Sequence, residues 1–165
     1  RLHVAVAIAL YTGLRYSNVI GLRWKHVNLG QGKITLPASE MKGKQQLELP
    51  IHPVLSKLLR QRLTDQNRVN SEALVVGEKV SALSKSLQRA LKRSGLRRIT
   101  WHGFRHTFSS WLYSRCPYAC VKKLLGHSPG SDVTALYIHP SWQEKVDAIN
   151  QLPDLLGAEP GSVAV

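Results

Sequence analysis

Apolar positions repeat along most of this chain with the three- to four-residue spacing of helices. The first segment, Leu2 to Leu10, is densely apolar and predicts a buried helix that ends at Thr12-Gly13. Pro53 and Pro117 stand where proline suits the first turn of a helix. The spacing predicts further helices over residues 19–24, 53–63, 80–96, 101–112, 117–125 and 142–152, and a short one that carries Tyr137 and is capped by Ser131 or Asp132.

Two shorter segments alternate apolar and polar positions with the two-residue period of strands. They cover residues 33–37 and 46–51, and a turn at Met41-Lys42-Gly43-Lys44 lies between them. The pair predicts a β-hairpin with lysines at its tip. We therefore expect one domain that is mainly α with a small β-hairpin or sheet (α+β), over residues 1–152, followed by a tail at residues 153–165.

The turn after the first helix contains Arg15, in Thr12-Gly13-Leu14-Arg15. Ser17 and Asn18 are residue types that cap helices, and we expect them to begin the helix at Val19. Arg15 then lies between two packed helices, with its guanidinium pointing outward. Taken alone, it could equally be an ordinary surface arginine.

The charge balance is the unusual part of the composition. Lysine and arginine total 23 against 10 acidic residues, which gives a formal net charge of +13 and a pI of about 10.2. Such an excess predicts a polyanionic partner, nucleic acid ahead of an anionic membrane. No apolar run approaches the roughly 20 residues that a membrane span needs.

One predicted helix concentrates this charge. Leu83, Leu87 and Leu91 recur at four-residue steps and predict its inner face. The outer face and the residues after it are almost all of one sign: Lys85, Arg89, Lys92, Arg93, Arg97 and Arg98. Most charged faces are merely solvated, but this uniformity favours contact with a phosphate backbone.

Two cysteines, Cys116 and Cys120, lie four positions apart, on one helix face or at a helix junction. A disulfide across one helical turn is geometrically awkward, and two thiols alone make no zinc site. We expect reduced thiols in a cytoplasmic protein.

The residue types that suit phosphate chemistry gather between Trp101 and Tyr137. Cleaving a phosphodiester needs a nucleophile in line, charge neutralisation at the non-bridging oxygens and a proton for the leaving 5′ oxygen. Arginine binds phosphate with two parallel hydrogen bonds, and histidine or lysine can move the proton. The candidates are Arg15, His102, Arg105, His106 and His127, with Tyr137 as a possible nucleophile.

Other chemistries are less well supported. His102 and His106 have the spacing of a zinc pair, but no third ligand accompanies them, and either could instead cap the core. The acidic residues are scattered, so a carboxylate site for Mg²⁺ is disfavoured. No phosphate-binding glycine loop is present. We therefore expect a tyrosine nucleophile, cationic stabilisation, and no metal or other cofactor.

These segments resemble the tyrosine recombinases, the phage-type integrases, in five ordered motifs over residues 5 to 140. The motifs are Thr12-Gly13-Leu14-Arg15-Tyr16-Ser17 with Gly21-Leu22-Arg23-Trp24, Met41-Lys42-Gly43-Lys44, His102-Gly103-Phe104-Arg105-His106-Thr107, Leu124-Leu125-Gly126-His127-Ser128, and Tyr137. Any one motif is weak, and the five in order are specific. The resemblance implies the catalytic-domain fold of that family.

The resemblance also implies a role for each matching residue. Tyr137 would attack the scissile phosphate and form a 3′-phosphotyrosyl link, while Arg15 and Arg105 clamp the non-bridging oxygens. Lys42 would protonate the leaving 5′ oxygen, with Lys44 as the less favoured register. His102 would assist as acid or base and His127 would orient the phosphate. Lys44 and the helix residues Lys85, Arg89, Lys92 and Arg93 would bind DNA.

By the same resemblance, the chain would be a fragment that lacks an N-terminal DNA-binding domain. The whole protein would act as a homotetramer on double-stranded DNA at attachment sites, without a membrane, and would be bacterial or phage-encoded, cytoplasmic and DNA-associated. Two departures stand out. Asn18 stands where the family usually has an acidic residue, and its amide would hold Arg15 less firmly than a carboxylate. Ten residues separate His127 from Tyr137, one more than is common.

Three alternatives remain. A type IB topoisomerase would use the same chemistry to relax DNA, a non-catalytic module would only bind DNA, and an RNA-binding domain would explain the charge but not the ordered motifs. Tyr16, Tyr113 and Tyr118 are the other nearby tyrosines, and context favours Tyr137.

Overall fold

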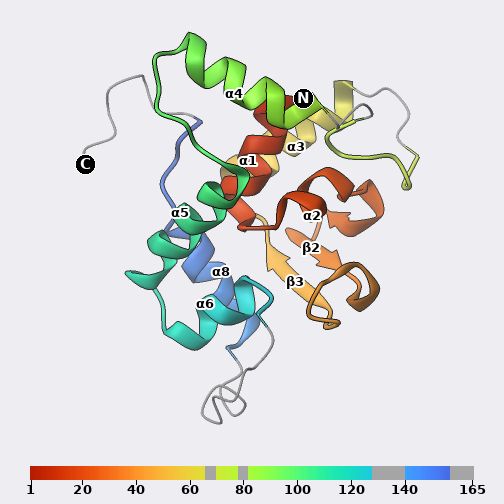
Figure 1. Cartoon of the computed structure of the whole chain (residues 1–165). Coiled ribbons are helices and arrows are strands. Elements are labelled where there is room, and N and C mark those ends of the chain that lie inside the picture. Colours follow the sequence, from red (N-terminus) through yellow and green to blue (C-terminus); the bar gives the residue numbers. More distant parts are fainter. Residues whose placement is uncertain (66–69, 78–81, 128–139, 157–165) are drawn as a thin grey trace.

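The computed structural model describes residues 1–65, 70–77, 82–127 and 140–156. Within these ranges the α-helices are α1 (Leu2–Thr12), α2 (Tyr16–Gly21), α3 (Pro53–Asp65), α4 (Leu83–Arg93), α5 (Trp101–Tyr113), α6 (Tyr118–Leu124) and α8 (Trp142–Asn150). Short 3₁₀ turns are η1 (Trp24–His26) and η2 (Ala38–Glu40), and the strands are β1 (Val27–Asn28), β2 (Lys33–Leu36) and β3 (Leu47–Pro50). The predicted class, mainly helical with a small sheet, is confirmed (Figure 1).

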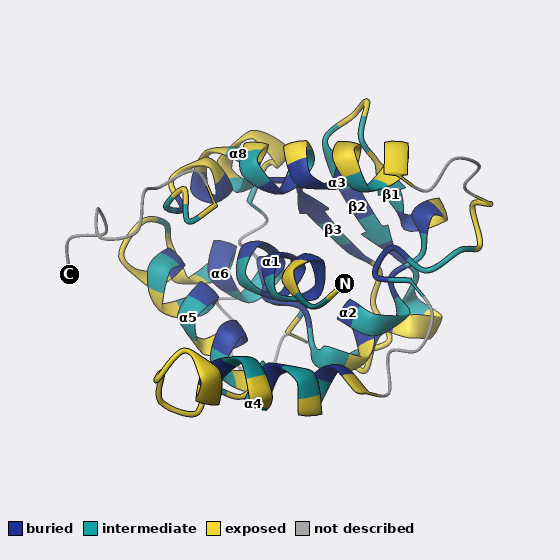
Figure 2. Cartoon of the chain, turned by 90° about the horizontal axis from the view of Figure 1, so that it is seen from above, coloured by how far each residue is buried: buried dark blue, intermediate teal, exposed yellow. Residues whose placement is uncertain are grey.

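Helix α1 is the centre of the molecule. Figure 2 views it nearly along its axis, with α4 and α5 to one side and α3 and the sheet to the other. Seven of its eleven residues are buried, including Ile8 and Tyr11. A helix that is apolar all round must be surrounded, because it has no polar face to present to water. The dense apolar start of the chain therefore predicted this position correctly.

The sheet is an antiparallel meander in the order β1-β2-β3. Leu36 pairs with Leu47 and Lys33 pairs with Pro50, so β2 and β3 form the predicted hairpin. The two-residue strand β1 adds an edge that the alternation did not indicate. Ile34, Leu36 and Leu49 are buried, which attaches the sheet to the helical core.

The start of α2 differs from the prediction. The helix begins at Tyr16 with Arg15 as its N-cap, so Ser17 and Asn18 lie within it and do not cap it. Asn18 is instead buried, and its Nδ2 donates to the backbone oxygen of Glu40 at 3.0 Å. The helix also ends at Gly21, and Trp24 belongs to the separate turn η1.

The remaining helices largely follow the predicted pattern. Helix α4 is shorter than the predicted 80–96, and α8 ends two residues before 152. Cys116 and Cys120 are free thiols at the junction of α5 and α6, as expected, and burial above all raises the pKa of Cys120 to about 12. Among the helices of the described residues, none has the length and apolar character that a membrane span requires.

Candidate active site

The first arginine motif lies where α1 ends and α5 crosses it. Gly13 has a left-handed φ of +61°, and its N–H bonds to the oxygen of Ala9 at 3.0 Å. A Cβ at this position would lie 2.3 Å from the ring of Phe108 in α5. Only glycine permits both the backbone conformation and so close an approach. The chain can therefore leave α1 directly beside α5 and place Arg15 at the start of α2.

Arg105, which lies in α5, links this helix to the ends of α1 and α6 through hydrogen bonds to backbone oxygens. The residue is only 7% exposed, and its guanidinium donates to the oxygen of Gly13 at 2.6 Å and to that of Leu125 at 2.8 Å. Burial first, and then the neighbouring charge of Arg15, lowers the pKa of Arg105 to about 10. The group stays protonated at neutral pH. Arg105 thus carries a buried positive charge between the ends of α1 and α6.

Arg15 provides a second cation for the same place. Its Nη1 is buried and has no hydrogen-bond partner among the residues that the structure describes. At least this end of the guanidinium is buried, so the expectation that the group points outward is not met. A buried charged donor left unpaired is costly, by about 1–3 kcal/mol or more. A phosphate group, whose two non-bridging oxygens can accept hydrogen bonds from both guanidinium groups, is the type of ligand that would satisfy both arginines.

An aromatic cluster that the sequence pattern did not indicate links the start of α2 to the start of α5. Tyr16, directly after Arg15, stacks on Trp101 with ring centroids 4.9 Å apart. Trp101 also meets Phe104 edge-on, and its Nε1 donates to Ser84 Oγ of α4 at 3.0 Å. The signal available in the sequence was an aromatic residue beside each arginine motif. This cluster fixes the distance between the helices that carry Arg15 and Arg105.

His127 lies at the C-terminus of α6. The helix ends in a Schellman motif in which the His127 N–H bonds to the oxygen of Lys122 and the Gly126 N–H bonds to that of Lys123. Gly126 has φ +61°, so the predicted glycine cap is confirmed. Burial lowers the pKa of His127, and the charges of Arg105, Arg15 and Lys122 lower it further. The imidazole therefore shares the electrostatic field of both arginines.

The lysine turn approaches this site from the sheet. The Lys44 N–H bonds to the Met41 oxygen at 2.9 Å, which closes a turn with Lys42 exposed at its tip. Met41 is buried, and a Cβ on Gly126 would lie 3.0 Å from its Cε. The hairpin is thus anchored beside the residue that precedes His127. Lys44, also exposed, has a left-handed φ of 49°.

His102 and His106 lie on the exposed side of α5, so neither caps the core. Their rings meet edge-to-face at 4.4 Å. The spacing of three residues between His102 and Arg105 would place both on one helix face, but Arg105 is buried while His102 is exposed. In the part of the chain that the structure describes, no three His, Cys, Asp or Glu residues are grouped to hold a metal ion.

One further prediction lies outside the described residues, and another lies within them. Tyr137, with the capping residues Ser131 and Asp132, lies outside the described residues. The basic face of α4 is exposed as predicted, with Leu83, Leu87 and Leu91 buried on the opposite side. That face comprises Lys85, Arg89, Lys92 and Arg93.

Two arginines and a histidine at converging helix ends form a group of donors that suits a phosphate ligand. The sequence model of the phage integrase family matches residues 1–144, and the chain belongs to that family.

Curated relatives agree. The chain is 27% identical over 147 residues to an integrase of Shigella phage Sf6, covering 86% of this chain and 38% of the relative. It is 25% identical over 194 aligned positions to a XerC-like tyrosine recombinase of Caldanaerobacter subterraneus subsp. tengcongensis, covering 94% and 50%. This chain therefore spans half or less of the length of these relatives.

Solved structures show the same fold. The integrase from mycobacterium phage Brujita superimposes with a TM-score of 0.68 at 20% identity, over 92% of this chain and 51% of that one. The XerH recombinase bound to a palindromic difH substrate, in a post-cleavage complex, gives a TM-score of 0.60 at 25% identity, over 78% and 39%. The catalytic-domain fold expected from the motifs is confirmed.

Proposed function

We propose that this chain is the catalytic domain of a site-specific recombinase that cleaves and rejoins DNA through a 3′-phosphotyrosyl intermediate. The observation that carries the proposal is the pair Arg15 and Arg105. The guanidinium of Arg105 is buried between helix ends, and that of Arg15 has a buried nitrogen without a partner in the described part of the chain. The charges of both lower the pKa of His127. A non-bridging phosphate oxygen pair offers the acceptors that such a cluster requires.

In this proposal Tyr137 attacks the phosphorus and the 5′ oxygen leaves. Arg15 and Arg105 neutralise the charge that develops on the non-bridging oxygens, and His127 donates to one of them. Lys42 delivers the proton to the leaving oxygen, and His102 assists as acid or base. A 5′ hydroxyl from another strand then attacks the phosphotyrosyl bond and restores the phosphodiester. Because the energy of the phosphodiester bond is conserved in the phosphotyrosyl bond, the reaction requires neither ATP nor a cofactor.

The whole protein is proposed to be longer than this chain. Support comes from the relatives, which are about twice as long or more, and from the XerH complex with its DNA substrate. We propose an additional N-terminal DNA-binding domain, a homotetramer on two attachment sites, and a cytoplasmic, DNA-associated location. Residues 1–152 would be the catalytic domain and residues 153–165 its tail.

The exposed basic face of α4, together with Lys44, is proposed to contact the DNA backbone. Each phosphate neutralised contributes a slope of about −0.9 in a plot of log affinity against log salt. Replacing Arg89 and Lys92 by Gln should therefore reduce that slope by about 1 to 2. An unchanged slope in a filter-binding titration would place the DNA on another face.

The experiment that tests the function is covalent trapping. The full-length protein is incubated in EDTA with nicked DNA from candidate attachment sites, and adducts are resolved on a denaturing gel. We expect an adduct from the wild type and from Tyr113→Phe, which alters an exposed tyrosine at the end of α5. Tyr137→Phe should give none.

The outcomes separate the alternatives. Tight binding of its own site without any adduct would favour a non-catalytic DNA-binding module. Relaxation of supercoiled plasmid without strand exchange between two sites would favour the topoisomerase.

A further inference from the structure

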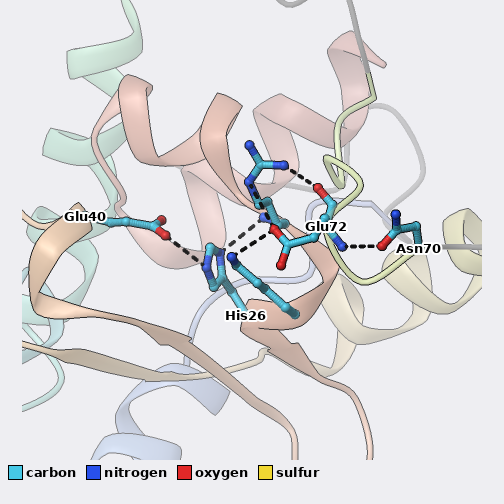
Figure 3. A network of polar contacts seen from close by, with 6 residues as sticks. His26, Glu40, Asn70 and Glu72 are labelled. Atoms are coloured by element: carbon cyan, nitrogen blue, oxygen red, sulfur yellow. Dashed lines mark hydrogen bonds and ion pairs between the residues drawn. The ribbon is translucent and has the colours of Figure 1, made fainter.

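The turn that carries Lys42 is held by a residue that has no part in the phosphate site. Glu40 precedes Lys42 by two positions and ends the 3₁₀ turn η2. Its backbone oxygen accepts from Asn18 Nδ2 at 3.0 Å, so α2, the helix that directly follows Arg15, is linked to the lysine turn. Its carboxylate Oε1 lies 3.3 Å from Nε2 of His26 (Figure 3).

His26 is a fixed partner for this carboxylate. The residue is 6% exposed, and its Nδ1 accepts from the Arg23 N–H at 3.2 Å. A neutral imidazole that accepts at Nδ1 carries its proton on Nε2, the nitrogen that faces Glu40. The Nε2–H is not aligned well enough for a hydrogen bond, so the contact with Glu40 is electrostatic.

The backbone on which His26 stands is itself tied to a second segment. The Trp24 N–H bonds to the oxygen of Ala73 and the Lys25 N–H bonds to that of Ser71. The Lys25 ammonium also forms an ion pair with the Glu72 carboxylate at 2.9 Å. The backbone N–H of Glu72 in turn donates to Asn70 Oδ1 (Figure 3). These contacts hold the two residues before His26, and the pairing of Val27 with Ile34 in the sheet holds the residue after it, so His26 is well placed to hold another group.

We propose that His26, acting through Glu40, is a positioning residue that holds the Lys42 turn in register with Arg15 and Arg105. The proposal rests on the proposed function, because it gives Lys42 a proton to deliver. Three contacts define the register: Asn18 on the Glu40 backbone, His26 on its carboxylate, and buried Met41 against Gly126. The His26 contact also occupies the acidic group nearest in sequence to Lys42, so that the exposed ammonium stays available for the phosphate.

The physical reason is the short reach of proton transfer. A general acid must come within hydrogen-bond distance of the leaving oxygen, and a misplacement of 1 Å can cost on the order of 100-fold in rate. Lys42 is exposed at the tip of a turn, where its own packing does little to orient it. Its position must therefore be set by the residues before and after it.

The test compares a leaving group that needs a proton with one that does not. The full-length protein cleaves DNA with an ordinary 5′ oxygen, or with sulfur in that bridging position, where the departing thiol has a pKa of about 8.5. Lys42→Ala should slow cleavage at oxygen by about 100-fold or more and be largely rescued by sulfur. Glu40→Gln and His26→Gln should each slow cleavage at oxygen by about tenfold and leave cleavage at sulfur within about twofold of the wild type.

The matched control is Glu48→Gln. Glu48 lies on β3 of the same hairpin, is about as exposed as Glu40, and also has an ion-pair partner, Lys33 at 3.0 Å. It should leave both rates unchanged. Equal slowing on the two substrates, or no slowing at oxygen, would overturn the positioning role. Failure of the proposed function would look different: the wild type would give no Tyr137-dependent adduct with either substrate.

Discussion

Replacing Arg105 by lysine keeps the buried positive charge but removes the fork that joins two helix ends. In the wild type one nitrogen donates to the oxygen of Gly13 at 2.6 Å and another to that of Leu125 at 2.8 Å. These oxygens belong to the ends of α1 and α6. A lysine ammonium is a single point on a flexible stem, so we expect it to satisfy one carbonyl and leave the other buried without a donor.

The expected loss can be worked out from these two contacts. A hydrogen bond from a charged donor contributes about 1.5–3 kcal/mol to stability. The electrostatic cost of the buried cation beside Arg15 remains, because lysine is also charged. The free energy of unfolding of Arg105→Lys should therefore fall by about 1.5–3 kcal/mol. For a domain of this size that corresponds to a decrease in Tm of about 3 to 12 °C.

The assay is urea and thermal unfolding followed by circular dichroism, with Arg115→Lys as the matched control. Arg115 follows α5, is exposed, and also donates to two oxygens, the backbone oxygen of Trp111 and Ser114 Oγ. Because both acceptors stay accessible to water, the control should change stability by less than about 0.5 kcal/mol. An Arg105→Lys protein as stable as the control would refute the view that this guanidinium holds α1 and α6 together.

Two further predictions concern the same site. Gly13→Ala should destabilise by about 2–5 kcal/mol, because it adds the strain of a left-handed alanine to a Cβ placed 2.3 Å from Phe108. The control is Gly32→Ala: Gly32 also has a φ of +61°, but a Cβ there would meet nothing within 4 Å, so this change should cost only the backbone strain of about 1–2 kcal/mol. If urea titrations showed the same loss of unfolding free energy for both variants, the packing argument would be contradicted. For His127 the folded-state pKa lies below the usual value because of burial first and then Arg105, Arg15 and Lys122. The unfolded chain therefore binds more protons, so stability should be constant above pH 7 and fall as the pH drops through about 6.5. His127→Gln should remove the part of this loss of stability at low pH that His127 causes. An NMR titration should show the imidazole pKa rising when DNA or vanadate binds. A pKa of about 6.5 or above in the free protein would contradict the structure.

Much of the fold was predictable because periodicity and helix ends are local properties. Gly126 was identified as a cap from its place after the apolar positions of α6, and the structure confirms it with both Schellman hydrogen bonds. The start of α2 was wrong for a tertiary reason. Ser17 and Asn18 have the intrinsic preference of caps, but stacking of Tyr16 on Trp101 and the bond from Asn18 to Glu40 draw both into the helix.

The sequence motifs named three residues that the structure brings close together, but the motifs did not indicate the geometry. The motifs named Arg15, Arg105 and His127, and the structure brings them into one electrostatic field. The inward orientation of Arg15 and the burial of Arg105 depend on packing between segments that are about 90 residues apart, which no local pattern encodes. The pairing of His26 with Glu40 is of the same kind, since nothing in either residue's own neighbourhood indicates the other.

The glycines of the two motifs gain a physical explanation from Arg105. Each helix that meets this guanidinium ends in a glycine with a left-handed φ, Gly13 after α1 and Gly126 after α6. Ending a helix in this way frees carbonyl oxygens that no longer have an intrahelical partner. Arg105 takes one such oxygen from each end, Gly13 itself and Leu125 immediately before Gly126. The two glycine motifs therefore act on the candidate phosphate site through backbone carbonyls, because they supply the acceptors that hold a buried cation in place. Each glycine also redirects the chain toward a further candidate residue: Arg15 follows Gly13 by two residues, and His127 directly follows Gly126.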